Sequence, residues 1–295
     1  MDKQILIIGS GTMGSGIAHT FAQFHFPVYL YDSNATALER AINQIHSNIE
    51  RQISKGSIAL SDKQTILNCI TPTNDFAFAA KKSFLIIEAV PESLEIKRKV
   101  FETLDQICDP ATILASNTSS ISITQLANFT KRPEKVIGMH FMNPVPIMPL
   151  VEVISSNFTS KETIQTVIEI SKQLNKIPVC TADFPGFVAN RILMPMINEA
   201  ICTLDQGVAG VEEIDQIMKL GMAHPMGPLQ LADYIGLDIC LNIMNVLHTG
   251  FGTDKYAPSP LLIRMVESGY LGNKTKKGFY NWDNPKNLLV NEVLF

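Results

Sequence analysis

The sequence predicts an α/β domain with a doubly wound, mostly parallel sheet, followed by an all-helical C-terminal domain. Its 295 residues suffice for two domains of about 150 residues. Up to about residue 184, short apolar runs alternate with stretches of helical period, which is the pattern of repeated β-α-β units. The alternation stops at Asp183-Phe184-Pro185-Gly186, so the domains are predicted to span residues 1–184 and 185–295.

Seven strands are expected in the first domain, several of them apolar throughout, as strands covered on both faces must be. They are residues 4–8, 28–31, 84–90, 113–116, 136–141, 150–154 and 177–181. In the second domain helical periodicity predicts no strand and four helices, at residues 187–206, 211–220, 228–248 and 259–268.

Composition excludes several classes of protein. With 46% hydrophobic and 18% charged residues, the chain resembles soluble globular proteins and not disordered ones. A net charge of −4 has the wrong sign for a protein that binds nucleic acid by neutralising phosphates. The longest apolar stretches, 137–154 and 184–202, contain polar or charged residues, so no membrane span is expected.

The cysteines favour a reducing compartment. All five are widely spaced and form no CxxC pair, which argues against a zinc site and against a disulfide framework. No secretory signal is expected before the apolar run 5–8. The protein is therefore expected in the cytoplasm, without a bound metal.

A glycine-rich motif, Gly9-Ser10-Gly11-Thr12-Met13-Gly14, follows the first expected strand. It matches the G-x-G-x-x-G fingerprint of Rossmann-type dinucleotide-binding domains, and it precedes an amphipathic helical stretch, as that fingerprint requires. Gly9 would turn the chain, Gly11 would let the backbone approach a pyrophosphate, and Gly14 would let helix pack on strand. The motif is predicted to bind the cofactor at the helix N-terminus.

Asp32 ends the second expected strand, eighteen residues after Gly14. In a dinucleotide-binding domain its carboxylate would accept hydrogen bonds from the adenosine ribose and would repel the additional phosphate of NADP. The predicted cofactor is therefore NAD. The alternative is a solvated strand-end aspartate or a helix N-cap, because Ser33 and Asn34 follow.

Two apolar runs around Pro146 place a histidine opposite a glutamate. If the runs pair antiparallel about Pro146, residue i faces residue 292 − i, and His140 faces Glu152. A carboxylate that fixes the imidazole tautomer and stabilises the imidazolium suits a general base. His140 also ends a strand on the side where open α/β sheets bind ligands, which favours catalysis over a structural histidine and ion pair.

The segment Ser116-Asn117-Thr118-Ser119-Ser120 also follows an expected strand. Its hydroxyls and amides could hold a bound oxygen. They could equally be turn and N-cap residues, which for most of the five is the more frequent role.

Together these segments resemble the L-3-hydroxyacyl-CoA dehydrogenase family, in particular its short stand-alone members, the 3-hydroxybutyryl-CoA dehydrogenases. The resemblance extends from residue 4 to about residue 282. It rests on the glycine motif, IEAVPE at 87–92, ASNTSS at 115–120, GMHFMNPVP at 138–146, LVEV at 150–153, PGFVANR at 185–191, HPMGP at 224–228 and GFY at 278–280.

The resemblance implies a hydride transfer between NAD and C3 of a short-chain (S)-3-hydroxyacyl-CoA, in fatty-acid β-oxidation or butanoate metabolism. It implies that His140 removes the proton of the 3-hydroxyl and that Glu152 orients His140. Ser119 and Asn190 are expected at the reacting oxygen or the thioester, with Ser119 also near the cofactor. Asn143 is expected at the nicotinamide.

Three further residues, Glu92, Lys97 and Lys274, are implied at the ribose and phosphates of the cofactor. Taken alone, both lysines would be solvated surface residues, and Asn190 could satisfy a buried backbone group. The cationic cluster nearest the expected site is Arg51 with Lys55, so Lys55 is predicted to contact the coenzyme A phosphates.

The resemblance also implies that the helical domain binds substrate, forms a homodimer and closes over the acyl group. The sequence departs from the family pattern at Pro149, where a lysine is common, and at Ala223 and Lys276, where glycine is frequent. Residues 284–295 extend past the match.

Two other functions compete with this interpretation. One is a nucleotide-binding protein that has lost turnover, against which the set of His140, Glu152, Ser119 and Asn190 argues. The other is a dehydrogenase of free hydroxy acids or sugar acids on the same two-domain plan.

Overall fold

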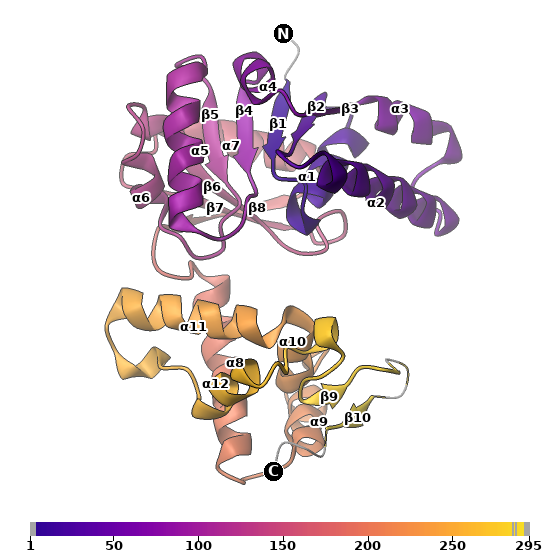
Figure 1. The fold of residues 1–295 in the computed structure, drawn as a ribbon, viewed down its shortest axis with the longest axis vertical. Helices are drawn as coiled ribbons and strands as arrows, with labels where there is room; N and C mark the ends of the chain where they lie inside the picture. The colour runs from indigo at the N-terminus through magenta and orange to yellow at the C-terminus, as the bar shows by residue number, and fades with distance from the viewer. Residues whose placement is uncertain (1–3, 285, 287, 292–295) are drawn as a thin grey trace. The chain divides into compact units, whose positions relative to one another are not determined.

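The first unit of the chain, Met1–Phe184, is built on an eight-stranded sheet in the order β3-β2-β1-β4-β5-β6-β7-β8 (Figure 1). The computed structural model describes residues 4–284, 286 and 288–291. Neighbouring strands are parallel except β6 and β7, which are antiparallel. The strands are β1 (Ile5–Ile8), β2 (Val28–Tyr31), β3 (Ile70–Thr73), β4 (Leu85–Glu88), β5 (Ile113–Ser116), β6 (Val136–Phe141), β7 (Leu150–Ser155) and β8 (Ile177–Ala182). The strand order reverses between β1 and β4, which confirms the doubly wound prediction.

Helices connect the strands of this unit. They are α1 (Thr12–Gln23), α2 (Ala35–Ser54), α3 (Lys63–Asn68), α4 (Phe76–Lys82), α5 (Leu94–Ile107), α6 (Ile123–Ala127) and α7 (Lys161–Gln173), with 3₁₀ turns η1 (Leu60–Asp62) and η2 (Pro133–Lys135). Asn34, Asp75, Ser122 and Ser160 cap the N-termini of α2, α4, α6 and α7, because each side chain accepts a hydrogen bond from an amide of the first turn.

The central strands are buried on both faces, as their apolar sequence predicts. All four residues of β1 and all four of β4 are buried. Burying one such isoleucine or leucine side chain contributes about 1.5–3 kcal/mol. This burial holds the ends of β1, β4 and β5 close together.

Two strands differ from the prediction. β3 was not expected, because its four residues include Pro72 and two exposed side chains, and it forms an edge of the sheet where the proline needs no ladder partner. β4 ends at Glu88 and does not continue to residue 90, because the Val90 amide donates to the Glu88 carboxylate (2.7 Å) and Pro91 follows.

The second unit, Pro185–Phe295, is mainly helical. It contains α8 (Ala189–Asp205), α9 (Val211–Gly221), α10 (Pro228–Ile235), α11 (Leu237–Phe251) and α12 (Pro260–Glu267), the 3₁₀ turns η3 (Asp254–Tyr256) and η4 (Asn273–Thr275), and a hairpin of β9 (Tyr280–Asn281) with β10 (Leu289–Val290). The hairpin corrects the expectation of no strand. Each of its strands has only two residues, too few to show a period in the sequence.

The helix expected over 228–248 is two helices, α10 and α11. Gly236 separates them with φ 108°, a conformation that only glycine adopts without strain. Across the described ranges, no helix has both the length and the apolarity that a membrane crossing requires.

Candidate active site

A cavity of about 920 Å³ lies at the carboxyl ends of β1, β2 and β4, where the strand order reverses. Residues of the glycine motif, Asp32 and the start of α2 line it. α1 begins at Thr12, and its N-cap, Gly11, provides no side-chain cap. The first amides of α1 are therefore available to an anion bound in the cavity.

The glycines of the motif allow close packing at Gly14 and leave open space at Gly11. A Cβ at Gly14 would lie 1.8 Å from the carbonyl oxygen of Gly9, so the packing of α1 on β1 excludes any side chain there. A Cβ at Gly11 would meet no atom within 4 Å, so Gly11 borders open space. Gly9 has φ 97°, which turns the chain between strand and helix. This geometry fits a dinucleotide.

Asp32 lies against the glycine motif. Its Oδ2 accepts hydrogen bonds from the Ser10 amide (2.8 Å) and hydroxyl (2.7 Å), and its Oδ1 accepts one from the Asn34 amide (2.9 Å). Partial burial would raise the pKa of Asp32, but these hydrogen bonds outweigh burial and hold the pKa below its usual value. The carboxylate is therefore charged at neutral pH. Asn34, not Asp32, caps α2.

Arg40 and Gln44 of α2 and Ile96 of α5 also line the cavity, although no sequence motif includes them. Arg40 and Gln44 are four residues apart, so they share one face of α2. The helical period of the stretch after Asp32 is the signal that could have identified them.

His140 and Glu152 form a buried pair across β6 and β7. Each pair of opposite residues from Gly138–Ile154 to Phe141–Val151 has numbers that add to 292, so the predicted register is confirmed. His140 Nδ1 lies 2.7 Å from Glu152 Oε2, and the two residues are 8% and 3% exposed. This distance is that of a charge-assisted hydrogen bond.

The segment 116–120 is held by two glutamates. The Ser116 hydroxyl donates to Glu88 (2.6 Å), and the amides of Ser119 (3.0 Å) and Ser120 (3.1 Å) donate to Glu92. Asn117 Oδ1 accepts from the amide of Phe141 (2.9 Å), the residue after His140. The segment is thus tied to the strand that carries His140, and the hydroxyls of Ser116, Thr118 and Ser120 fasten it to the two glutamates.

Lys97 is 1% exposed, so the interpretation of it as a solvated surface lysine is wrong. Its ammonium contacts Glu88 Oε1 (2.7 Å) and Glu92 Oε2 (3.2 Å). Glu88, which is fully buried, was not predicted as part of the site. Burial would raise the pKa of Glu92, but Lys97 and the hydroxyls of Thr118 and Ser120 hold it below its usual value.

The other predicted residues come from several parts of the chain. Asn143 is exposed in the connection between β6 and β7, and Lys55 is exposed just after α2. Asn190 lies in α8 and is 9% exposed. Lys274 is half exposed and pairs with Asp238, so it is not a lysine surrounded only by solvent.

At two of its departures from the family pattern, the chain adopts the backbone that glycine favours. Ala223 has φ 57° and Lys276 has φ 62°, both in the left-handed region that costs most side chains about 1–2 kcal/mol. At the third departure, the carbonyl oxygen of Pro149 accepts a hydrogen bond from the Ile177 amide (2.7 Å).

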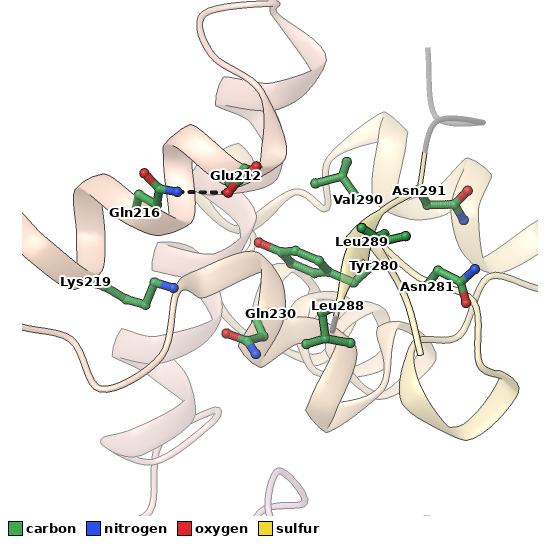
Figure 2. A pocket seen from close by; sticks show the side chains of 10 residues that line it. All are labelled: Glu212, Gln216, Lys219, Gln230, Tyr280, Asn281, Leu288, Leu289, Val290 and Asn291. Atoms are coloured by element: carbon green, nitrogen blue, oxygen red, sulfur yellow. Dashed lines mark hydrogen bonds between the residues drawn. The ribbon is translucent and has the colours of Figure 1, made fainter. Parts of the chain in front are cut away.

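A second cavity, of about 750 Å³, lies in the second unit and contains none of the predicted residues. Figure 2 shows the Tyr280 ring at its centre, with Glu212, Gln216 and Lys219 of α9 on one side and the hairpin residues on the other. β10, in the segment beyond the family resemblance, forms part of its wall.

Comparison with known proteins covers both units. The NAD-binding domain of the 3-hydroxyacyl-CoA dehydrogenases matches residues 4–184, and the C-terminal domain of the same enzymes matches residues 186–282. A 3-hydroxybutyryl-CoA dehydrogenase of Clostridioides difficile is 52% identical over 280 residues, which cover 95% of this chain and 99% of the relative. A probable 3-hydroxybutyryl-CoA dehydrogenase of Bacillus subtilis (strain 168) is 50% identical over 281 residues, 95% of this chain and 98% of the relative. The crystal structure of (S)-3-hydroxybutyryl-CoA dehydrogenase from Ralstonia eutropha has a TM-score of 0.91 at 45% identity and covers 94% of this chain and 98% of that one.

Proposed function

Because the chain belongs to the 3-hydroxyacyl-CoA dehydrogenase family and is an NAD-dependent dehydrogenase, we propose that it interconverts (S)-3-hydroxybutyryl-CoA and acetoacetyl-CoA. In this proposal residues 1–184 bind NAD, and residues 185–295 bind the acyl part of the substrate and form a homodimer. The free state of all five cysteines suits the reducing cytoplasm, where we place the enzyme.

The observation that carries the proposed chemistry is the hydrogen bond between His140 and Glu152. When Nδ1 donates its proton to Glu152, Nε2 carries the lone pair that a general base needs. Glu152 also stabilises the imidazolium that forms when Nε2 accepts a proton. The hydrogen bond assigns this tautomer, since hydrogen positions follow from the network of acceptors.

NAD, when bound in the first cavity, supplies the hydride acceptor. His140 Nε2 takes the proton of the 3-hydroxyl as the C3–H bond breaks and the C3=O double bond forms. In the reverse direction the imidazolium returns that proton to the oxygen. A positioned acid–base group of this kind contributes about a hundredfold to ten-thousandfold in rate.

We assign the surrounding residues from the family resemblance. Ser119 and Asn190 are proposed to donate hydrogen bonds to the reacting oxygen or the thioester carbonyl, and Asn143 to contact the nicotinamide. The glycine motif and Asp32 are proposed to hold the pyrophosphate and the adenosine ribose.

Three charged residues, Glu92, Lys97 and Lys274, are proposed to bind near the ribose and phosphates of the cofactor. Lys55 is proposed to contact the coenzyme A phosphates. Because its ammonium is enclosed by two glutamates, Lys97 is proposed to act through Glu92.

The test is the NADH-linked reduction of acetoacetyl-CoA by His140→Gln. We expect kcat to fall at least about a hundredfold, because the amide cannot exchange the proton. The dissociation constant for NADH is expected to stay the same. His46→Gln, at an exposed histidine of α2, is the matched control and should keep full activity. Activity of His140→Gln within a few-fold of the wild type would remove His140 from this role.

The substrate class is tested by comparing kcat/KM for acetoacetyl-CoA with that for free acetoacetate. We expect a strong preference for the coenzyme A ester. Equal rates on the two would instead favour a dehydrogenase of free hydroxy acids.

A further inference from the structure

Lys176 is a buried lysine, and none of the described carboxylates pairs with it. It precedes β8 directly and is 7% exposed. Its Nζ donates hydrogen bonds to the carbonyl oxygens of Val145 (2.6 Å) and Met148 (2.8 Å), and within the described ranges it forms no ion pair. Burial lowers the pKa of Lys176. Removing a charge from water costs free energy, so the groups that this ammonium holds indicate its role.

Both carbonyls belong to the β6–β7 loop, residues 142–149. The loop begins two residues after His140 and carries Asn143. The loop also contacts α1, the helix that follows the glycine motif. A Cβ at Gly16 of α1 would lie 3.0 Å from Val145 Cγ2, so Val145, which is 2% exposed, packs directly on the helix that begins at the glycine motif.

The loop needs a donor to keep this shape. Asn143 is exposed, and Ile147 is 72% exposed, so apolar burial holds only part of the loop. The amides of Ile147 and Met148 both donate to the Pro144 carbonyl (3.0 Å each), which leaves the Val145 and Met148 carbonyls to Lys176. An ammonium that donates to two carbonyls binds more strongly than neutral donors do.

We propose that Lys176 is a positioning residue, whose ammonium fixes the β6–β7 loop so that Asn143 meets the nicotinamide end of the cofactor beside His140. This inference rests on the proposed function for the contact of Asn143. In this proposal Lys176 itself touches neither substrate nor cofactor, since its ammonium is taken up by the two loop carbonyls. It acts on the loop that follows the catalytic strand and packs on α1 through Val145.

The test is the affinity of Lys176→Met for two ligands that share the adenosine and pyrophosphate. NADH carries the nicotinamide and ADP-ribose does not. Without the ammonium, we expect the dissociation constant for NADH to rise about tenfold and that for ADP-ribose to change less than twofold. Equal changes for both ligands, or none for either, would overturn the proposal.

Two further variants keep the test decisive. Lys172→Met, at an exposed lysine of α7, is the matched control and should bind both ligands as the wild type does. Lys176→Gln keeps a donor to one carbonyl, so it tests the proposal if Lys176→Met does not fold. We expect it to lose NADH affinity about threefold with ADP-ribose unchanged, and NADH affinity equal to that of the wild type would count against the proposal.

Asn143→Ala separates this proposal from the proposed function. If Lys176 acts through Asn143, the double variant binds NADH no more weakly than the weaker single variant. Additive losses would overturn the positioning role alone. Unchanged NADH affinity in Asn143→Ala would remove the assigned contact, and the positioning role with it. All these measurements are made without turnover, so they do not depend on His140.

Discussion

Each unit of the chain holds a pair of neighbouring carboxylates, but among the described residues only the pair in the first unit contacts a cation. There, Lys97 contacts both Glu88 and Glu92. In the second unit, Asp215 and Asp233 are each 1% exposed, and in the described part of the chain no lysine or arginine pairs with them. Neutral donors take the place of the cation. Asp233 accepts from the amides of Phe279 and Tyr280 and from the Trp282 indole, and Asp215 accepts from the amides of Leu229 and Gln230 and from the Tyr280 hydroxyl.

The pKa of Glu92 and the pKa values of the two aspartates are shifted in opposite directions. Lys97 and nearby hydroxyls hold the pKa of Glu92 below its usual value. Burial raises the pKa of Asp215, and it raises that of Asp233 to about 6, although every hydrogen bond that these two carboxylates accept favours the charged form. Asp32, which is only partly buried, has three neutral donors and a lowered pKa. Neutral donors therefore suffice at the surface, but not where water is fully excluded.

The aspartates of the second unit fasten its C-terminal hairpin to the helices. They accept from residues of β9, of the segment after it and of α10. Two glycines leave room for them, because a Cβ at Gly227 would lie 2.1 Å from Asp215 Cγ and one at Gly278 would lie 2.0 Å from Asp233 Oδ1. We conclude that the second pair is structural, whereas the first pair also shapes the segment that carries Ser119.

The largest effect is expected from Lys97→Met, which would give the first unit a carboxylate pair without a cation. Because two partly or fully buried charges lose their partner, the free energy of unfolding should fall by about 3–5 kcal/mol. Urea unfolding followed by far-ultraviolet circular dichroism measures it. Lys99→Met, which breaks only the exposed pair with Glu95, should cost about 0.5 kcal/mol or less. Equal losses in the two variants would show that Lys97 is not needed to balance the glutamates.

A smaller effect is expected from pH, on which the stability of the second unit should depend through Asp233. The pKa of Asp233 is raised from 3.8 to about 6, so between these values the folded protein binds more protons than the unfolded one. Its contribution to stability is present at about pH 4 and is lost as the pH rises through 6, a change on the order of 3 kcal/mol.

Asp233→Asn removes this titration. We expect the unfolding free energy of the wild type, relative to this variant, to decrease by on the order of 3 kcal/mol between pH 4 and pH 7. The fluorescence of Trp282, the single tryptophan, reports unfolding of this unit. Asp283→Asn, at an exposed aspartate, should show no such trend. A difference that is independent of pH would mean that Asp233 is already charged below pH 4.

The smallest effect concerns Asp32, the carboxylate that neutral donors keep charged. In Asp32→Asn the repulsion of the extra phosphate of NADPH disappears, and so does an acceptor for the ribose of NADH. We expect the ratio of the dissociation constants for NADPH and NADH to shift at least about tenfold toward NADPH, as measured by fluorescence titration. Asp62→Asn, at an exposed aspartate, is the control. An unchanged ratio would exclude Asp32 from the choice of cofactor.

Much of the first unit could be predicted because local patterns encode it. The continuously apolar run of β1, the glycine motif after it and the apolar runs around Pro146 each reflect preferences of neighbouring residues, and the His140–Glu152 register follows from the symmetry of one hairpin. β3 and the hairpin of the second unit escaped prediction because their short strands carry no such pattern.

By itself, the sequence determined most strands of the first unit, the cofactor motif and the pairing of His140 with Glu152, because each depends on residues close together in the chain. Only the tertiary structure decided that Lys97 is buried between Glu88 and Glu92, and that Lys176 holds the β6–β7 loop from 28 and 31 residues away. The helix and strand propensities of a lysine are the same whether it is exposed or buried, so the residues next to it in the chain do not reveal its burial. Its surroundings are set by which strands and helices pack beside it, and that arrangement is a property of the whole sheet.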